Sequence, residues 1–215
     1  MNDFNQSLQD LRESYDREPL RRSHLSPDPF VQFEQWMQEA VDGGIYDPNA
    51  CSLATVDQSG APSARAVLLK GLENGKFVFY SNYNSRKAGH LLSNPKVSMH
   101  FPWFSMQRQV AVLGEVSKVE DSMAEEYFQS RPLLSRIGAW ASEQSKPLDN
   151  RESLEKSFLE ALEKYGEHPP RPPHWGGYYL SPHSVEFWQG GPNRLHDRFL
   201  YQLSEELWKI TRLNP

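Results

Sequence analysis

The hydrophobic positions of the chain first recur at helical spacing. In PFVQFEQWMQEAVDGG (residues 29–44) apolar residues return every three or four positions, which predicts an amphipathic helix ended by the two glycines. The apolar positions are Phe30, Phe33, Trp36, Met37 and Ala40. The preceding residues 1–28 are polar and carry Pro19 and Pro27, so we expect a short helix followed by a mobile N-terminal arm.

From Ala50 the pattern changes to short runs rich in β-branched and aromatic residues, separated by turn residues. These runs predict roughly eight strands in hairpin order. They are CSLATV, APSARAVLLKG, KFVFYSN, KVSMHFPW, QRQVAVLGEVSKV, GGYYLSPHSVEFWQ, RLHDRFLYQL and ELWKITRL. The ENG segment between the second and third runs is predicted to be a hairpin turn rather than part of a phosphate-binding loop.

Helical signals interrupt the strands in two places. SRKAGHLLSNP predicts one short helix capped by Asn84 or Ser85, and residues 121–164 predict three more, the second beginning at Pro132. We therefore expect a β-rich α+β fold, a closed antiparallel barrel with peripheral helices. At 215 residues, one domain over 29–215 is the better expectation.

Composition excludes several classes of protein. A hydrophobic fraction of 38% and a mean hydropathy of -0.71 favour a soluble protein, and no apolar run reaches the roughly 18 residues of a membrane helix. The N-terminus lacks the pattern of a signal peptide, so a cytoplasmic location is expected. The net charge of -5 argues against nucleic-acid binding.

Two residue types that often carry chemistry are not arranged for it here. Cys51 is the only cysteine and lies in an apolar run, which favours a small core residue over a nucleophile. The seven histidines show no HxH or HExxH spacing, so no metal site is expected. GxGxxG and GxSxG motifs are absent from the sequence.

The segment EFWQGGPNRLHDRFLY is the strongest local candidate for a site. If RLHDRFLY is a strand, its period of two places Arg194, His196 and Arg198 on one face, close to Trp188 and the Gly190–Pro192 turn. Such a face suits a polyanionic, aromatic ligand. The same pattern of charged residues is also found on the solvent-exposed face of edge strands, and this is the commoner case.

Other cations stand next to hydroxyl groups. Strand alternation in RAVLLK sends Arg65 and Lys70 to opposite faces, and SRK opens a helix whose N-terminus favours phosphate. Tyr127, Arg131 and Ser135 share one helical face if the helix continues through Pro132. Considered singly, each of these sets of residues is also typical of ordinary charged residues on a protein surface.

Several polar residues are uninformative alone. Gln109, and Gln144 with Ser145, have no partner nearby in the sequence, and such amides can read the edge of a planar heterocycle. Arg12 and Tyr15 fit a mobile tail.

These motifs, in this order, resemble the pyridoxamine (pyridoxine) 5'-phosphate oxidase family. The similarity covers nearly the whole chain, and twelve ordered motifs are far more specific than any one of them. They run from LRESY through RAVLLK, FYSN, SRKA, FPW, RQV, YFQSRP, IGAW and EQS to EFWQGG, RLHDRFLY and WKITRLNP.

The resemblance implies a split-barrel homodimer that binds flavin mononucleotide (FMN) in two clefts between subunits. It implies that the flavin phosphate is bound by Arg65, Lys87 and Ser145, with Arg86 beside them. The rest of the flavin would be contacted by Val67, Leu68, Tyr80, Ser81, Gln109, Gln144, Trp188 and Arg198. The substrate phosphate would be held by Lys70, Tyr127, Arg131 and Ser135. Arg194 and His196 would face the pyridine ring as catalytic residues, and Arg12 and Tyr15 would belong to an N-terminal segment that closes over the site.

The implied reaction is oxidation of pyridoxamine or pyridoxine 5'-phosphate by dioxygen, giving pyridoxal 5'-phosphate and hydrogen peroxide. The alternatives are a phenazine-type oxidase of the same fold and a non-catalytic flavin- or haem-binding barrel. Arg21, Arg22 and Arg212 have no role in this site and fit either surface charge or a secondary anion site.

Overall fold

The computed structural model describes residues 7–8, 11 and 14–215. They form two compact units, and three strands pass through both. The first unit comprises the described residues up to Pro48 with His100–Ala111 and Ser184–Pro215, and the second comprises Asn49–Met99 and Val112–His183. Arg12 lies outside the described residues.

Eight strands form one sheet in the order β3-β2-β1-β4-β5-β6-β7-β8, and an additional pairing of β3 with β6 closes the first six into an antiparallel barrel. This confirms the predicted number of strands and the barrel. The β1–β4 and β3–β6 pairings depart from simple hairpin order. The strands are β1 (Ala50–Val56), β2 (Pro62–Glu73), β3 (Lys76–Asn82), β4 (Lys96–Trp103), β5 (Arg108–Lys118), β6 (Trp175–Gln189), β7 (Asp197–Ser204) and β8 (Leu207–Leu213).

In the second unit, β1, β2 and β3 form consecutive hairpins. Asn74 and Gly75 both have positive φ at the β2–β3 connection, which confirms the predicted hairpin turn. Near its end β2 contains one extra residue, because Leu69 faces Phe79 while Gly71 already faces Val78. This bulge reverses the alternation of side chains after Leu69.

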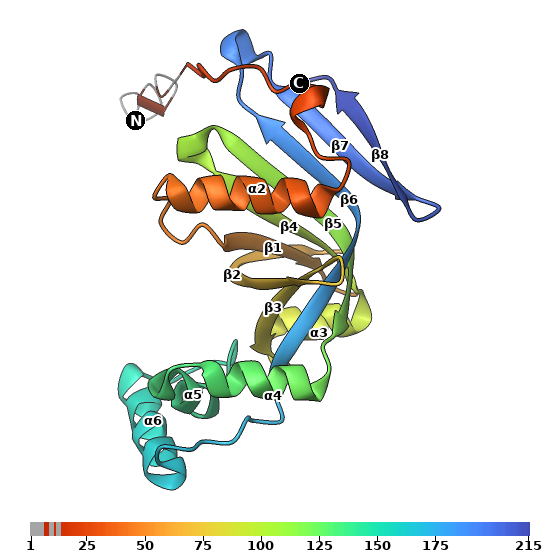
Figure 1. Cartoon of the computed structure of the whole chain (residues 1–215). Helices are drawn as coiled ribbons and strands as arrows, with labels where there is room; N and C mark the ends of the chain where they lie inside the picture. The colour runs from red at the N-terminus through yellow and green to blue at the C-terminus, as the bar shows by residue number, and fades with distance from the viewer. Residues whose placement is uncertain (1–6, 9–10, 12–13) are drawn as a thin grey trace. The chain divides into compact units, whose positions relative to one another are not determined.

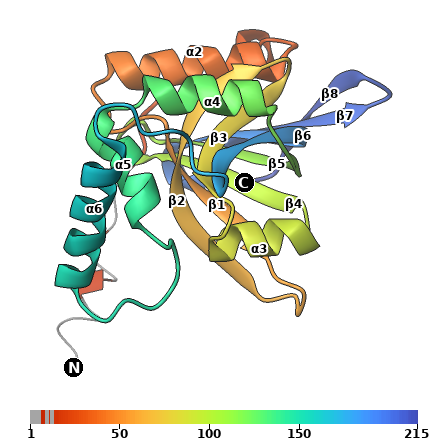
Figure 2. The ribbon, with the colours of Figure 1, turned by 90° about the horizontal axis from the view of Figure 1, so that it is seen from below.

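Four helices belong to the second unit: α3 (Arg86–Ser93), α4 (Asp121–Ser130), α5 (Leu133–Ala141) and α6 (Arg151–Tyr165). The predicted N-cap of α3 is confirmed at Ser85. Figure 1 shows α4, α5 and α6 grouped together, and Figure 2 shows α5 and α6 side by side. Pro132 separates α4 from α5, because proline disfavours helical conformation at the residue before it and Arg131 is extended with ψ 149.

Gly114 in β5 lies against the backbone of β6, so replacing it should destabilise the second unit. A Cβ at this position would lie 2.8 Å from Pro182 Cα and closer still to the Ser181 carbonyl oxygen. We expect Gly114→Ala to lower the free energy of unfolding by about 2–3 kcal/mol, measured by urea denaturation. Gly89→Ala in α3, where a Cβ meets nothing within 4 Å, is the control and should be neutral or stabilising by up to about 1 kcal/mol. Equal stabilities of the two variants would contradict this account.

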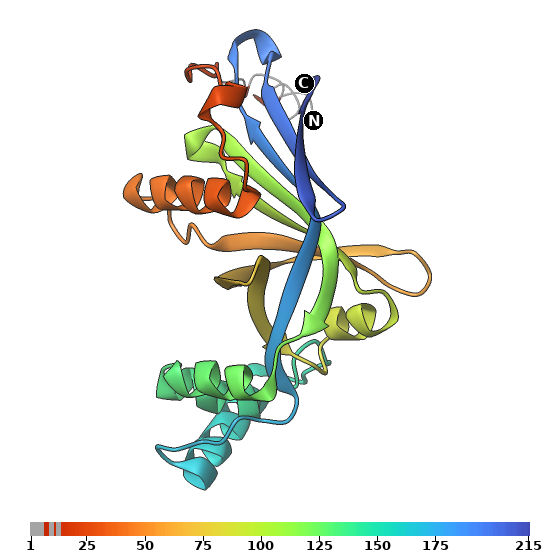
Figure 3. The ribbon, with the colours of Figure 1, turned by 45° about the vertical axis from the view of Figure 1, so that its right-hand side comes forward.

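The first unit contains α2 (Pro29–Asp42) and the β7–β8 hairpin (Figure 3). The helix confirms the predicted span; Asp28 caps it by accepting a hydrogen bond from the Phe30 N–H, and Gly43 ends it. Trp36 packs edge to face on Phe187 with ring centroids 5.1 Å apart, so the predicted apolar face of the helix forms part of the core.

Cys51 is buried, and burial raises the pKa of its thiol to about 12, as expected of a core residue. A search of the described helices finds none that combines the length and apolarity needed to cross a membrane.

Candidate functional site

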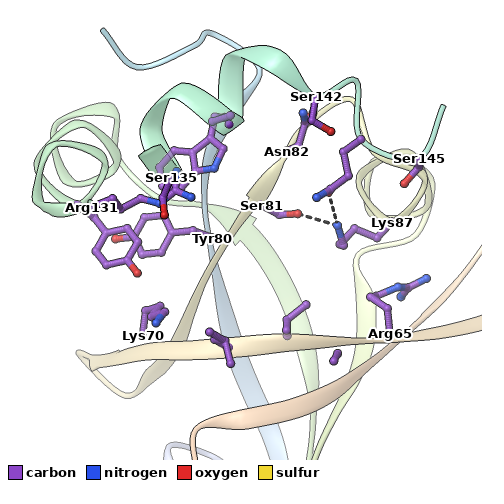
Figure 4. Close-up of a pocket in the computed structure, with 18 of the residues that line it drawn as sticks. Arg65, Lys70, Tyr80, Ser81, Asn82, Lys87, Arg131, Ser135, Ser142 and Ser145 are labelled. Carbon is purple, nitrogen blue, oxygen red and sulfur yellow. Dashed lines mark hydrogen bonds between the residues drawn. The ribbon is translucent and has the colours of Figure 1, made fainter. Parts of the chain in front are cut away.

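A cavity of about 930 Å³ opens in the second unit, between β2, β3, α3, α5 and the loop after α5. Thirteen of the residues predicted from sequence line it, although they come from five separate motifs. They are Arg65, Val67, Leu68, Lys70, Tyr80, Ser81, Arg86, Lys87, Tyr127, Arg131, Ser135, Gln144 and Ser145. Figure 4 shows Arg65 and Lys87 on one side of the cavity, and Lys70, Arg131 and Ser135 on the other.

Lys87 is the most buried cation of the cavity. Its Nζ donates to Ser81 Oγ at 2.8 Å, Ser85 Oγ at 3.2 Å and Gln144 Oε1 at 2.8 Å, all uncharged oxygens. Burial, and secondarily the neighbouring Arg65, lower the pKa of this amine to about 8. An anion that enters here would therefore favour the charged state of the lysine and raise its pKa.

Arg65 is also held by uncharged acceptors. Its guanidinium donates to the Leu53 carbonyl at 2.9 Å, Thr55 Oγ1 at 2.8 Å and Ser63 Oγ at 2.6 Å. Arg86 donates to the same Ser63 Oγ at 2.8 Å, and burial together with Arg86 lowers the pKa of Arg65. Among the described residues, no carboxylate forms an ion pair with Arg65, Arg86 or Lys87. These three side chains, called the cationic cluster below, carry charge that a bound anion can neutralise.

Arg131 is a second candidate for anion binding in the same cavity. Its guanidinium lies over the Trp175 ring, 4.7 Å from the centroid, and its Nη1 is buried without a hydrogen-bond partner in the described structure. A buried guanidinium N–H without a partner is unfavourable, so this atom is ready to donate to a ligand.

Tyr127, Arg131 and Ser135 do not share one helical face, because the condition for it, a helix that continues through Pro132, is not met. Tyr127 lies in α4, Arg131 is extended beyond its end, and Ser135 lies in the first turn of α5. The Pro132 break, rather than helical spacing, brings the three to one cavity.

Arg65 and Lys70, which strand alternation assigns to opposite faces of β2, both line this cavity, and Figure 4 shows them on opposite sides of it. The extra residue in β2 redirects the side chains that follow Leu69.

An aromatic stack lies beside Arg131 in the same cavity. Tyr80 is nearly parallel to Tyr127, with centroids 3.9 Å apart, and to Trp175, with centroids 5.4 Å apart. Burial, and secondarily Tyr127, raise the pKa of Tyr80 to about 12, so its phenol is neutral at physiological pH. Neutral aromatic rings beside a cationic position suit a planar ligand that carries an anionic group.

The other predicted flavin residues, Gln109, Trp188 and Arg198, line a smaller cavity of about 270 Å³ in the first unit. Gln109 Oε1 lies 2.8 Å from His100 Nε2, and Arg198 forms an ion pair with Glu186 at 2.7 Å. This ion pair raises the pKa of Arg198. Arg198 is therefore already neutralised, unlike the cationic cluster.

The predicted strand through Arg194, His196 and Arg198 is wrong at its start. β7 begins at Asp197, after a short 3-10 turn (η3, Pro192–Arg194) in which Asn193 and Arg194 have φ of 55° and 62°. Pro192 lacks a backbone N–H and cannot donate a hydrogen bond to a strand ladder, and the left-handed residues turn the chain. Only Arg198 lies in the strand.

Although His196 lies outside the strand, its ring is held by a hydrogen bond within the turn. Its Nδ1 accepts a hydrogen bond from the Gly191 N–H at 3.2 Å, so the ring proton lies on Nε2. Partial burial, followed by the charge of Arg194, lowers the pKa of this imidazole, which favours the neutral form. The ring packs against Trp188 and Tyr15, at centroid distances of 4.7 and 5.4 Å.

Asp197 anchors the N-terminal segment beside this turn. The buried carboxylate accepts from the Leu20 N–H at 2.8 Å and pairs with Arg212. Arg212 therefore has a structural role that the sequence did not indicate.

Eight further residues that the sequence did not single out line the larger cavity. Trp175 had a usable signal, because a tryptophan directly before the β-rich GGYYL run is suited to a strand start rather than to a surface loop. Small apolar residues carry no such local signal. The eight are Ala64, Ala66, Asn82, Pro132, Gly138, Ala139, Ser142 and Trp175.

Comparison with known proteins gives two family matches on this chain. Residues 37–165 match the family "Pyridoxamine 5'-phosphate oxidase", and residues 175–215 match the "Pyridoxine 5'-phosphate oxidase C-terminal dimerisation region". A pyridoxine/pyridoxamine 5'-phosphate oxidase of Burkholderia mallei is 52% identical over 97% of this chain and 99% of its own length. That of Burkholderia thailandensis is 49% identical over the same shares.

Two solved structures show the same fold. PhzG of Burkholderia lata, in complex with tetrahydrophenazine-1-carboxylic acid, superposes with a TM-score of 0.88 at 28% identity, over 94% of this chain and 100% of that one. A pyridoxamine 5'-phosphate oxidase-related, FMN-binding protein of Nostoc punctiforme gives a TM-score of 0.69 at 18% identity, over 89% and 100% of the two chains. The barrel is thus the split barrel expected from sequence. With a family match over more than half of its length and relatives near 50% identity over nearly all of it, the chain belongs to the pyridoxamine 5'-phosphate oxidase family of oxidoreductases.

Proposed function

We propose that the protein oxidises pyridoxamine 5'-phosphate or pyridoxine 5'-phosphate with dioxygen, using bound FMN. Pyridoxine 5'-phosphate and dioxygen give pyridoxal 5'-phosphate and hydrogen peroxide. The amine substrate additionally consumes water and releases ammonia. The names of its full-length relatives support this assignment.

The observation that carries the proposal is the presence of two separate cationic positions in one cavity. The cationic cluster of Arg65, Arg86 and Lys87 suits one phosphate, and Arg131 with its partnerless Nη1 suits another. Lys70, Tyr127 and Ser135 line the same cavity and would bind the second phosphate together with Arg131. A flavin phosphate and a substrate phosphate require two such positions.

The residues present fit FMN. Lys87 and Arg65 are oriented by neutral oxygens, so their charge is left for the phosphate, with Arg86 and Ser145 beside them. Tyr80 and Ser81, Val67, Leu68 and Gln144 would line the remainder of the cofactor, with Gln109, Trp188 and Arg198. Bound flavin would supply the redox chemistry, by accepting two electrons from the substrate carbon and returning them to dioxygen.

The chain's own side chains would position the substrate. Arg131 and Lys70 hold its phosphate, and Arg194 and His196 orient the pyridine ring. His196, with its proton on Nε2, can donate to an oxygen of the ring substituents, and Arg194 supplies positive charge. Tyr15, packed on His196 and Trp188, would help to exclude water together with Arg12, which lies outside the described residues.

The match to a dimerisation region indicates a homodimer. We propose further that each flavin site lies between two subunits. The test uses mixed dimers in which each subunit carries a substitution at a different flavin-binding residue. If the two residues reach each flavin site from different subunits, one of the two sites contains both defects and the other contains neither. Quenching of flavin fluorescence would then show that one site per dimer binds flavin again.

The function is tested by mixing purified protein with FMN and pyridoxine 5'-phosphate in air. We expect pyridoxal 5'-phosphate, detected by its absorbance, and an equal amount of peroxide. Unphosphorylated pyridoxine is the matched control and should react far more slowly, because it cannot occupy the Arg131 position. Tetrahydrophenazine-1-carboxylic acid tests the alternative suggested by the similarity to PhzG. Oxidation of that compound without oxidation of pyridoxine 5'-phosphate would overturn the proposal.

A further inference from the structure

A buried hydroxyl lies directly behind Arg65. Thr55 in β1 has 0% of its surface exposed, and its Oγ1 lies 2.8 Å from Arg65 Nη1. The same oxygen lies 3.0 Å from Nδ1 of His90, which is on α3. In the part of the chain that the structure describes, these two groups are the side-chain hydrogen-bond partners of Thr55. Arg65, Thr55 and His90 thus form a continuous chain from the cavity through β1 to the helix.

The donor and acceptor capacities of the three side chains determine the direction of these hydrogen bonds. A guanidinium only donates, so Thr55 Oγ1 accepts from Arg65. The single proton of the hydroxyl then needs an acceptor, because an unsatisfied O–H in a fully buried position is unfavourable. His90 Nδ1 is the atom within reach, so the imidazole accepts there and carries its proton on Nε2.

The remaining contacts of Arg65 are neutral as well. Ser63 stands opposite Thr55 in the β1–β2 register, so a hydroxyl from each strand contacts one guanidinium. A carboxylate in this position would orient Arg65 equally well, but it would neutralise the charge that a phosphate needs. A hydroxyl supported by an imidazole orients the group and leaves the charge available.

His90 stands outside the cavity that holds the cationic cluster. It is half-buried and lines a separate surface cavity of about 380 Å³ with Asp57. The Asp57 carboxylate is already engaged by the Ser59 N–H and hydroxyl and by the Ala61 N–H. The imidazole can therefore be replaced without opening the protein core or touching a bound ligand.

We propose that Thr55 and His90 are positioning residues, which orient Arg65 for the phosphate of the flavin. The inference rests on the proposed function, in which Arg65 grips that phosphate. Neither residue lines the larger cavity, so any effect on binding passes through Arg65.

The test compares FMN with riboflavin, which has the same ring system and no phosphate. Dissociation constants are measured by quenching of flavin fluorescence on flavin-free protein. Thr55→Val and His90→Ala should each weaken FMN binding about tenfold, because the first removes the hydroxyl that orients Arg65 and the second removes the acceptor that orients this hydroxyl. Riboflavin binding should be unchanged. Thr55→Ser retains the hydroxyl and His90→Asn retains an acceptor close to the Nδ1 position, so both should bind FMN within about twofold of the unmodified protein.

Each other outcome has a definite meaning. Unchanged FMN affinity in both disruptive variants would overturn the inference while leaving the proposed function intact. Equal loss of FMN and riboflavin would show a general structural role and would also overturn it. A protein that does not prefer FMN to riboflavin before any substitution would overturn the proposed function and the inference together. If Thr55→Val does not fold, the His90→Ala and His90→Asn pair decides the question.

Discussion

Replacement of Arg194 by alanine should lower turnover of pyridoxine 5'-phosphate about 100-fold, as expected when a charged group that stabilises the transition state is removed. The protein should still fold and bind FMN. Arg194 is exposed in the η3 turn, and no hydrogen bond or ion pair holds its guanidinium within the described structure. Its removal therefore breaks no interaction that maintains the fold.

The measurement is steady-state peroxide formation, with the visible spectrum of the bound flavin recorded on the same sample. Lys209→Ala on β8 is a matched control, because it removes an exposed cation from the same unit outside the site. It should retain full turnover. Full activity of Arg194→Ala would show that Arg194 is not a catalytic residue. Loss of bound FMN would show that Arg194 binds the cofactor instead.

Much of the fold follows from local patterns. Alternation and helical spacing predicted every strand and each helix from α2 to α6, because these periods reflect which side chains meet the core. Barrel closure by β3 and β6 was expected only in general terms, because pairing between strands distant in sequence depends on tertiary packing.

The candidate site was predicted in its residue types and less well in its geometry. The cations stand out in the sequence, since isolated Arg and Lys among apolar residues are conspicuous. One inserted residue in β2 interrupts the alternation at Lys70, and Pro192 with two left-handed residues removed Arg194 and His196 from the strand. Alternation rules assume a regular backbone, and these backbone irregularities occur where candidate ligand groups are presented.

Lys87 should make the affinity for FMN depend on pH. In the ligand-free protein its pKa is about 8, compared with an ordinary value of 10.5, because the amine is buried among neutral oxygens. Phosphate binds the charged amine. Below pH 8 the amine is already charged and affinity should be nearly constant, whereas above pH 8 binding must also take up a proton. The dissociation constant should therefore rise by up to about tenfold per pH unit above 8.

Replacement of Lys87 by glutamine should abolish this dependence and weaken FMN binding about 10- to 100-fold at pH 7. Lys96→Gln, an exposed change in the same unit, is the control and should retain both the affinity and its pH profile. Fluorescence titrations from pH 6.5 to about 9.5 provide the measurement. A Lys87→Gln profile parallel to that of the unmodified protein would assign the pH dependence to another group.

Folding cannot produce the same trend through Lys87. Since the amine has a lowered pKa in the folded protein, the unfolded chain binds more protons between pH 8 and 10.5. Stability therefore rises with pH across this window as far as Lys87 is concerned. Weaker FMN binding above pH 8, together with constant or higher resistance of the flavin-free protein to urea, would distinguish loss of the phosphate contact from loss of the fold. Parallel decreases in affinity and stability would contradict this assignment.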